Sequence, residues 1–108
     1  MKELIKIFAE DCEICAEMAK TELSFAKERE MRFLAIEMGE LAVRPETDPL
    51  RGYVIHHHVD KSDGTLDVPV YLIRHEGAIQ ASGVIEDADQ LTTLVDSWEL
   101  WLKLRSID

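Results

Sequence analysis

The apolar positions change their period along the chain, and each change marks an expected element. Residues 4–9 form a short apolar run interrupted by Lys6; its length does not separate strand from helix, but its β-branched residues favour a strand. Residues 12–29 then follow a helical period. The alternation over 31–38 predicts a second strand. The apolar stripe of the expected helix consists of Cys15, Met18, Ala19, Leu23 and Ala26.

The middle of the chain, residues 43–67, has the pattern that is hardest to interpret. Asp48 followed by Pro49 makes a good helix start, because aspartate caps a first turn and proline needs no helical donor there. Gly52 and the β-branched residues near it weaken the helix prediction that follows. The Asp-Gly pair within 61–65 predicts a turn.

The last third of the chain predicts a β-hairpin and a long amphipathic helix. Strands over 70–74 and 78–84 flank a Glu76-Gly77 turn, a pattern that is typical of a hairpin. A helix over 88–105 has the strongest periodicity in the sequence. Its apolar stripe consists of Leu91, Leu94, Val95, Trp98, Trp101 and Leu102.

This order of elements indicates one α/β domain over residues 1–108. The first two strands enclose a helix, so they should run parallel with a right-handed crossover, and the hairpin should add an antiparallel pair to the same small mixed sheet. Helices would cover that sheet. The content of 46% hydrophobic and 31% charged residues is ordinary for one small globular core.

The charge balance narrows the classes of partner. The chain has 12 lysine and arginine residues against 22 aspartate and glutamate residues, a formal net charge of −10. Nucleic acids and anionic membrane surfaces are therefore poor partners, because both need a basic face. No secretory leader or membrane-length apolar run is visible, and two cysteines do not make a disulfide scaffold, so we expect a monomer in the reducing cytoplasm.

The candidate chemistry lies in the motif Cys12-Glu13-Ile14-Cys15, which follows the first strand and opens the first helix. At a helix start the dipole favours a thiolate at the first cysteine, while the second, one turn later, is close enough to form a disulfide. Two metal ligands or two inert buried thiols are the alternatives. The strand–CxxC–helix context favours a redox dithiol.

Three segments together resemble the thioredoxin superfamily: "IKIFAEDCEIC", "DVPVYLIRHEGAIQASG" and the amphipathic C-terminal helix. The resemblance implies a thioredoxin-like fold in which Cys12 is the nucleophile and Cys15 the resolving thiol. It also implies that Pro69 is a cis proline beside the sulfur atoms and that Val68 offers its backbone to a substrate segment. Base rates alone would make the Pro69 bond trans.

The sequence departs from that family at several positions. Glu13 and Ile14 replace the Gly-Pro of typical thioredoxins and the Pro-Tyr of typical glutaredoxins, and Asp11 stands where thioredoxins usually carry tryptophan. Lys6 aligns with the buried acid of thioredoxins, which is more like glutaredoxins. The proton acceptor for the resolving thiol is therefore open, with Glu37 or a water molecule as candidates.

Acidic residues surround the motif and should oppose the helix dipole. A charge about 8 Å away in water contributes roughly 0.5 kcal/mol, and the dipole contributes at most about 1 kcal/mol at an exposed end. We therefore expect the pKa of Cys12 to lie near or above that of an ordinary thioredoxin, and a strongly reducing protein. These acids are Glu10, Asp11, Glu13 and Glu17.

The resulting hypothesis is a cytoplasmic thiol-disulfide oxidoreductase that needs no metal or organic cofactor. Its partners would be protein disulfides, preferred over glutathione because the site has no basic cluster, and an upstream reductase or small thiol. Ribonucleotide reductase is a client that the resemblance suggests. Two alternatives stay open: a metal-binding module that uses Cys12 and Cys15 with some of the histidines 56–58, and a redox-inactive interaction subunit.

Overall fold

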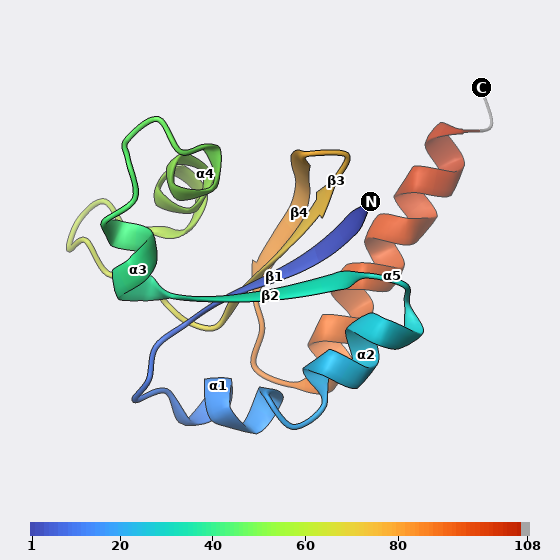
Figure 1. The fold of residues 1–108 in the computed structure, drawn as a ribbon, viewed down its shortest axis with the longest axis horizontal. Helices are drawn as coiled ribbons and strands as arrows, with labels where there is room; N and C mark the ends of the chain where they lie inside the picture. Colours follow the sequence, from blue (N-terminus) through green and yellow to red (C-terminus); the bar gives the residue numbers. More distant parts are fainter. Residues whose placement is uncertain (107–108) are drawn as a thin grey trace.

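The computed structural model describes residues 1–106, which form one four-stranded sheet with helices on both faces (Figure 1). The strands are β1 (Lys2–Phe8), β2 (Arg32–Glu37), β3 (Val70–His75) and β4 (Ala78–Val84). The helices are α1 (Glu13–Met18), α2 (Glu22–Glu28), α3 (Met38–Ala42), α4 (Pro49–His58) and α5 (Ala88–Arg105). Among residues 1–106, none of the helices combines the length and the apolar character needed to cross a membrane.

The strand order is β2-β1-β3-β4. β1 and β2 run parallel, as the helical connection between them predicts, and β3 is antiparallel to both β1 and β4. The hairpin turn uses Glu76 and Gly77, whose φ angles of 52° and 82° match the twist of a two-residue hairpin loop. The predicted small mixed sheet is therefore confirmed.

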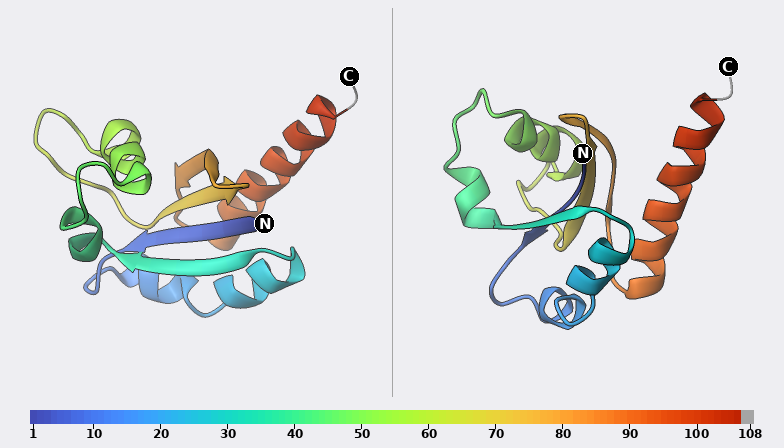
Figure 2. Two further views of the ribbon diagram at one scale, coloured as in Figure 1. Left: turned by 45° about the horizontal axis from the view of Figure 1, so that its top comes forward. Right: turned by 45° about the vertical axis from the view of Figure 1, so that its right-hand side comes forward.

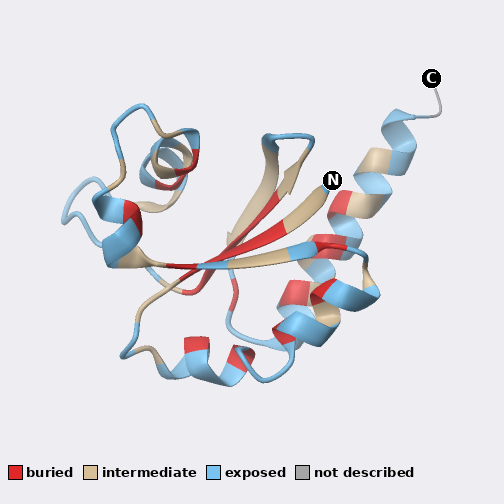
Figure 3. Cartoon of the chain, viewed as in Figure 1, coloured by how far each residue is buried: buried red, intermediate tan, exposed pale blue. Residues whose placement is uncertain are grey.

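Helices cover both faces of the sheet (Figure 2), and each face carries a core of its own. Residues from α1, α2 and α5 pack on one face, and residues from α3 and α4 pack on the other. Because side chains alternate along a strand, Leu4 and Tyr71 belong to the first core, whereas Ile5 and Leu72 belong to the second. The most deeply buried side chains accordingly follow the strands (Figure 3).

The predicted single helix over 12–29 is wrong, because the chain breaks it into α1 and α2. Thr21 has non-helical angles (φ −126°, ψ −15°), and the amides of Lys20 and Thr21 bond three residues back instead of four. This tight turn rotates α2 relative to α1. As a result Glu22 faces the interior with 5% of its surface exposed, and Leu23 of the predicted stripe is 66% exposed.

The middle segment forms the layer on the second face. The predicted helix start is confirmed: Asp48 caps α4, and its side chain accepts hydrogen bonds from the backbone amides of Leu50 and Arg51 at 2.9 Å and 3.3 Å. α3 was not predicted, and Met38 opens it instead of ending a strand. The Glu37 carboxylate caps α3 by accepting a hydrogen bond from the Glu40 backbone amide at 3.1 Å.

α5 covers the first face with the predicted bounds. Trp98 is buried and its indole N–H donates to the Gln80 side chain at 2.8 Å. Trp101 does not belong to the packed stripe: it is 42% exposed, and the Arg105 guanidinium lies 4.7 Å from the centre of its ring.

Candidate active site

A disulfide joins Cys12 and Cys15 at the point where β1 passes into α1. Cys12 is the residue before the helix, and Cys15 lies in the first turn, with 5.2 Å between the two Cα atoms. Cys12 is half-buried and Cys15 is 3% exposed. One sulfur can thus be approached from solvent, and the other is sheltered by the core.

Two backbone groups face Cys12. The Cys15 amide donates a hydrogen bond to Cys12 Sγ at 3.1 Å, which would also stabilise a thiolate at that atom. The Val68 carbonyl oxygen lies 3.8 Å from the same sulfur, and the Val68–Pro69 peptide bond is cis. The loop before β3 therefore lies beside the disulfide, although it is more than fifty residues away in the sequence.

The acidic residues around the motif lie on the solvent side of it. Glu10, Asp11, Glu13 and Glu17 are all exposed, as is Ile14 between the two cysteines. Glu17 pairs with Lys20 at 3.0 Å along the surface of the chain. An exposed pair of this kind contributes little, because water and salt screen it.

Lys6 lies on the opposite, interior side of the disulfide. It is 3% exposed, and its position in β1 pairs with Tyr71 of β3 and Ala35 of β2. Its ammonium donates to the Cys15 carbonyl oxygen at 2.7 Å and to Glu22 Oε1 at 3.0 Å. A buried ammonium needs such partners, because an unpaired charge in the core is very costly.

Glu22 is shared by two donors. Its second oxygen, Oε2, accepts the Tyr71 hydroxyl at 2.5 Å. Burial, followed by the hydrogen bond to Glu22, raises the pKa of Tyr71 well above its usual range, so the hydroxyl stays a donor. No buried side-chain nitrogen or oxygen within the described part of the chain lacks a hydrogen-bond partner. Lys6, Glu22 and Tyr71 therefore form a closed polar network, named here the Lys6–Glu22–Tyr71 network.

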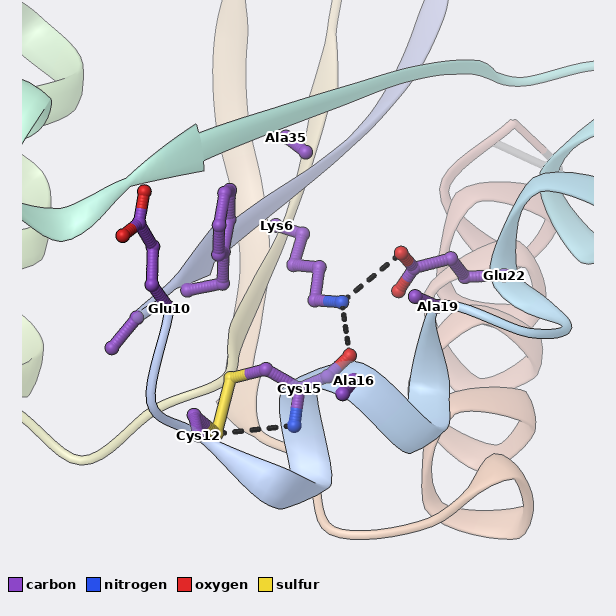
Figure 4. Close-up of a pocket in the computed structure, with 10 residues that line it drawn as sticks. Lys6, Glu10, Cys12, Cys15, Ala16, Ala19, Glu22 and Ala35 are labelled. Atoms are coloured by element: carbon purple, nitrogen blue, oxygen red, sulfur yellow. Dashed lines mark hydrogen bonds and ion pairs between the residues drawn. A yellow bond between two sulfur atoms is a disulfide. The ribbon is translucent and has the colours of Figure 1, made fainter.

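A cavity of about 270 Å³ connects this network with the disulfide (Figure 4). Both cysteines, Lys6 and Glu22 line it, and its other walls are largely apolar. Four alanines keep it open because their side chains are short: Ala9, Ala16, Ala19 and Ala35. The cavity places a cation and a carboxylate behind the sheltered sulfur.

Glu22 is the site residue that the sequence reasoning missed. Glu37, the residue that the sequence offers as a candidate proton acceptor for the resolving thiol, caps α3 and lies outside the cavity lining. One signal was available: a lysine whose neighbours in an apolar strand are all buried requires an acidic partner. The sequence offered no way to choose that partner.

The three histidines lie on α4, with His56 and His57 exposed and His58 half-buried. His58 Nε2 and the Tyr53 hydroxyl both contact Ser82 Oγ, at 2.8 Å and 2.9 Å. Burial, and then the charge of His57, lowers the pKa of His58. Within residues 1–106 no three histidine, cysteine, aspartate or glutamate side chains gather into a potential metal site.

This chain is similar to known proteins in its fold, whereas comparisons of its sequence find no match. No family model matches the sequence, and no curated protein matches it. Solved structures do match: a thioredoxin of Fasciola hepatica superposes with a TM-score of 0.63 at 15% identity, covering 89% of this chain and 79% of that one. The Drosophila melanogaster thioredoxin Deadhead gives 0.63 at 18% identity, with the same coverage of 89% and 79%.

The chain has the thioredoxin fold. A thioredoxin f2 solved together with ferredoxin:thioredoxin reductase also matches it, with a TM-score of 0.63 and 13% identity over 91% of this chain and 77% of that chain. At such identities the likeness concerns the fold.

Proposed function

We propose that this protein is a thiol-disulfide oxidoreductase that reduces disulfides in other proteins. One observation carries the proposal: a disulfide joins a half-buried cysteine to a sheltered one at a helix start, in a thioredoxin fold. The approachable sulfur suits an attacking thiol, and the sheltered sulfur suits a resolving thiol.

The reduced protein would act in two exchange steps. The Cys12 thiolate attacks one sulfur of a target disulfide, and the electron pair of the broken bond leaves on the other target sulfur, which takes up a proton. Cys15, as a thiolate, then attacks Cys12 Sγ and releases the second target sulfur as a thiol. The target gains two electrons, and the Cys12–Cys15 disulfide is formed again.

Groups around the dithiol would assist these steps. The Cys15 backbone amide would stabilise the Cys12 thiolate by donating a hydrogen bond to its sulfur. Val68 and Pro69 form the wall beside Cys12 along which an extended target segment would lie. The acidic surface of Asp11 and Glu13, with exposed Ile14 between the cysteines, would disfavour acidic targets.

The partners follow from the same chemistry. The protein disulfide is the substrate, and a reductase or a small thiol returns the two electrons to Cys12 and Cys15, without a bound cofactor. A thioredoxin of this fold has been solved in a complex with a reductase, which supports a reductase as partner in general terms. We place the protein in the reducing cytoplasm, as a monomer, with ribonucleotide reductase as one client to test.

The test is insulin disulfide reduction by the purified protein, with dithiothreitol as electron source. The wild type should accelerate insulin precipitation, and Cys12→Ser should abolish the acceleration. Cys15→Ser should keep a reactive Cys12 and accumulate a mixed disulfide that mass spectrometry detects. A wild-type protein no faster than dithiothreitol alone, while still binding a partner after both cysteines are replaced, would favour the interaction-subunit alternative.

A further inference from the structure

The buried Lys6–Glu22–Tyr71 network is more than the fold requires. Buried ion pairs can often be replaced by apolar residues of similar size without loss of stability. The stability of the fold therefore does not explain why Lys6 and Glu22 are present. The place of this pair is informative, since the Lys6 ammonium lies 2.7 Å from the carbonyl oxygen of Cys15. The network also opens onto the cavity that both sulfurs line.

Resting on the proposed function, we infer that the Lys6–Glu22–Tyr71 network handles the proton of Cys15 during the resolving step. Glu22 accepts that proton through water in the cavity, and Lys6 is the positioning residue that holds Glu22 and the Cys15 turn together. Tyr71 fixes the second carboxylate oxygen, so that Oε1 remains the oxygen shared with Lys6.

The charges support this assignment. When the proton leaves Cys15 Sγ for Glu22, one negative charge moves from the carboxylate to the sulfur. The Lys6 ammonium donates to Glu22 and to the backbone carbonyl oxygen of Cys15, and it lines the same cavity as Cys15 and Glu22. One cation therefore lies in the cavity wall with both the donor and the acceptor of the proton. The net charge of the cavity does not change, which avoids the cost of creating a new buried charge.

The cavity supplies the path. Its volume of about 270 Å³ exceeds the roughly 30 Å³ that one water occupies in the liquid, and Lys6 and Glu22 provide polar partners in its wall. The charged groups that face it are Lys6 from β1, Glu22 from α2 and Glu10 from the loop after β1. Glu10 is exposed, so Glu22 is the sheltered one of the two carboxylates.

The resolving step then balances. The proton of Cys15 goes to Glu22, and the Cys15 thiolate attacks Cys12 Sγ of the mixed disulfide. A Cys15–Cys12 bond forms, the bond from Cys12 to the target breaks, and the electron pair leaves on the target sulfur. Cys15 is oxidised in this step, and Cys12 stays at the oxidation level of a disulfide. The target sulfur is reduced and takes a proton from solvent, and Glu22 later returns its proton to solvent.

A single-turnover reaction with the aromatic disulfide 5,5′-dithiobis(2-nitrobenzoate) separates the two steps. Attack by Cys12 on the reagent releases a first coloured thiolate, and attack by Cys15 on the resulting mixed disulfide releases a second. Stopped-flow absorbance at several pH values gives both rates. Cys15→Ser identifies the first phase, because it lacks the second.

In Glu22→Gln the second phase should slow at least about tenfold at neutral pH, as expected for loss of a general base, while the first phase keeps its rate. The second phase should then rise with pH toward the range of an ordinary thiol, about 8.5. Glu22→Asp should recover part of the rate. The matched control is Glu28→Gln, which neutralises an exposed acid on the same helix and should leave both phases unchanged.

A second phase in Glu22→Gln with the wild-type rate and pH profile would overturn the inference. If Glu22→Gln does not fold, the Lys6→Met/Glu22→Gln variant decides in its place: a slowed second phase supports the role and a wild-type second phase contradicts it. A wild-type protein that releases no coloured thiolate, even in the first phase, would instead contradict the proposed function itself.

Discussion

Two sets of charged residues flank the dithiol, and they differ in how far they are exposed to solvent. The outer set consists of exposed acids beside Cys12, such as Asp11 and Glu13. The inner set is the buried pair of Lys6 and Glu22, with 3.0 Å between ammonium and carboxylate. The outer charges have bulk water and salt around them, whereas the inner charges are buried and face little more than the protein and one small cavity.

The shorter distance and the lower dielectric constant together raise the interaction energy of the inner pair by almost an order of magnitude. Two charges about 8 Å apart in water interact with roughly 0.5 kcal/mol, and a pair about 4 Å apart at an effective dielectric constant near 20 interacts with roughly 4 kcal/mol. Salt screens the outer set further. The outer acids can therefore tune the dithiol, while the inner pair can hold its structure and direct a proton.

Breaking the inner pair on one side should have the largest effect. Lys6→Met leaves the Glu22 carboxylate buried without its cation, so the free energy of unfolding should fall by about 3–5 kcal/mol, measured by urea unfolding. Lys6→Met/Glu22→Gln should recover most of this loss, because it leaves no unpaired charge. A double variant as unstable as Lys6→Met would contradict this view of the inner pair.

Removing the third member of the network should have an intermediate effect. Tyr71→Phe deletes the hydrogen bond to the buried carboxylate of Glu22 and should lower the free energy of unfolding by about 1.5–3 kcal/mol. Urea unfolding at neutral pH, with circular dichroism as the signal, measures the loss. A loss no greater than that of a typical surface substitution, about 0.5 kcal/mol, would speak against the network.

The same tyrosine predicts a loss of stability in alkali. Burial and Glu22 raise the pKa of Tyr71, so the folded protein keeps a proton that the unfolded chain releases above about pH 10. The stabilisation is complete below that pH and should decline as the pH rises beyond it. Unfolding midpoints measured across this range should show the decline in the wild type and in Tyr53→Phe, the other tyrosine, but not in Tyr71→Phe.

Neutralising the outer acids should have the smallest effect. Asp11→Asn or Glu13→Gln favours the Cys12 thiolate by roughly 0.5 kcal/mol, which makes the reduction potential about 10 mV less negative for each acid. A redox titration against glutathione or dithiothreitol measures this shift. It should shrink in about 1 M salt. A shift toward a more negative potential, or one that salt does not change, would contradict the outer-charge argument that predicts a strongly reducing protein.

The elements with an uninterrupted local pattern were predictable. α5 and the β3–β4 hairpin have the expected bounds to within a residue, because periodicity, caps and turn residues lie within the elements themselves. The parallel pairing of β1 and β2 followed from the helical connection between them. The position of Cys12 and Cys15 at a helix start was equally local, as was the helix start at Asp48.

The break between α1 and α2 was not predictable in the same way. The apolar period continues through Leu23 and Ala26, so a local pattern favours one long helix. In the structure Glu22 turns inward and Leu23 outward, since Lys6, sixteen residues earlier, requires a carboxylate in the core. α3 was not predicted either, because its five residues are too few to show a helical period.

The sequence by itself determined the order of the elements, the acidic surface and the CxxC motif at a helix start, because these depend on neighbouring residues. Tertiary structure alone decided which acid accompanies Lys6. That choice needed β1, α2 and β3 to meet in one buried place, where Lys6, Glu22 and Tyr71 each find a partner. A buried charge has to be compensated, and only the packed fold shows by which residue.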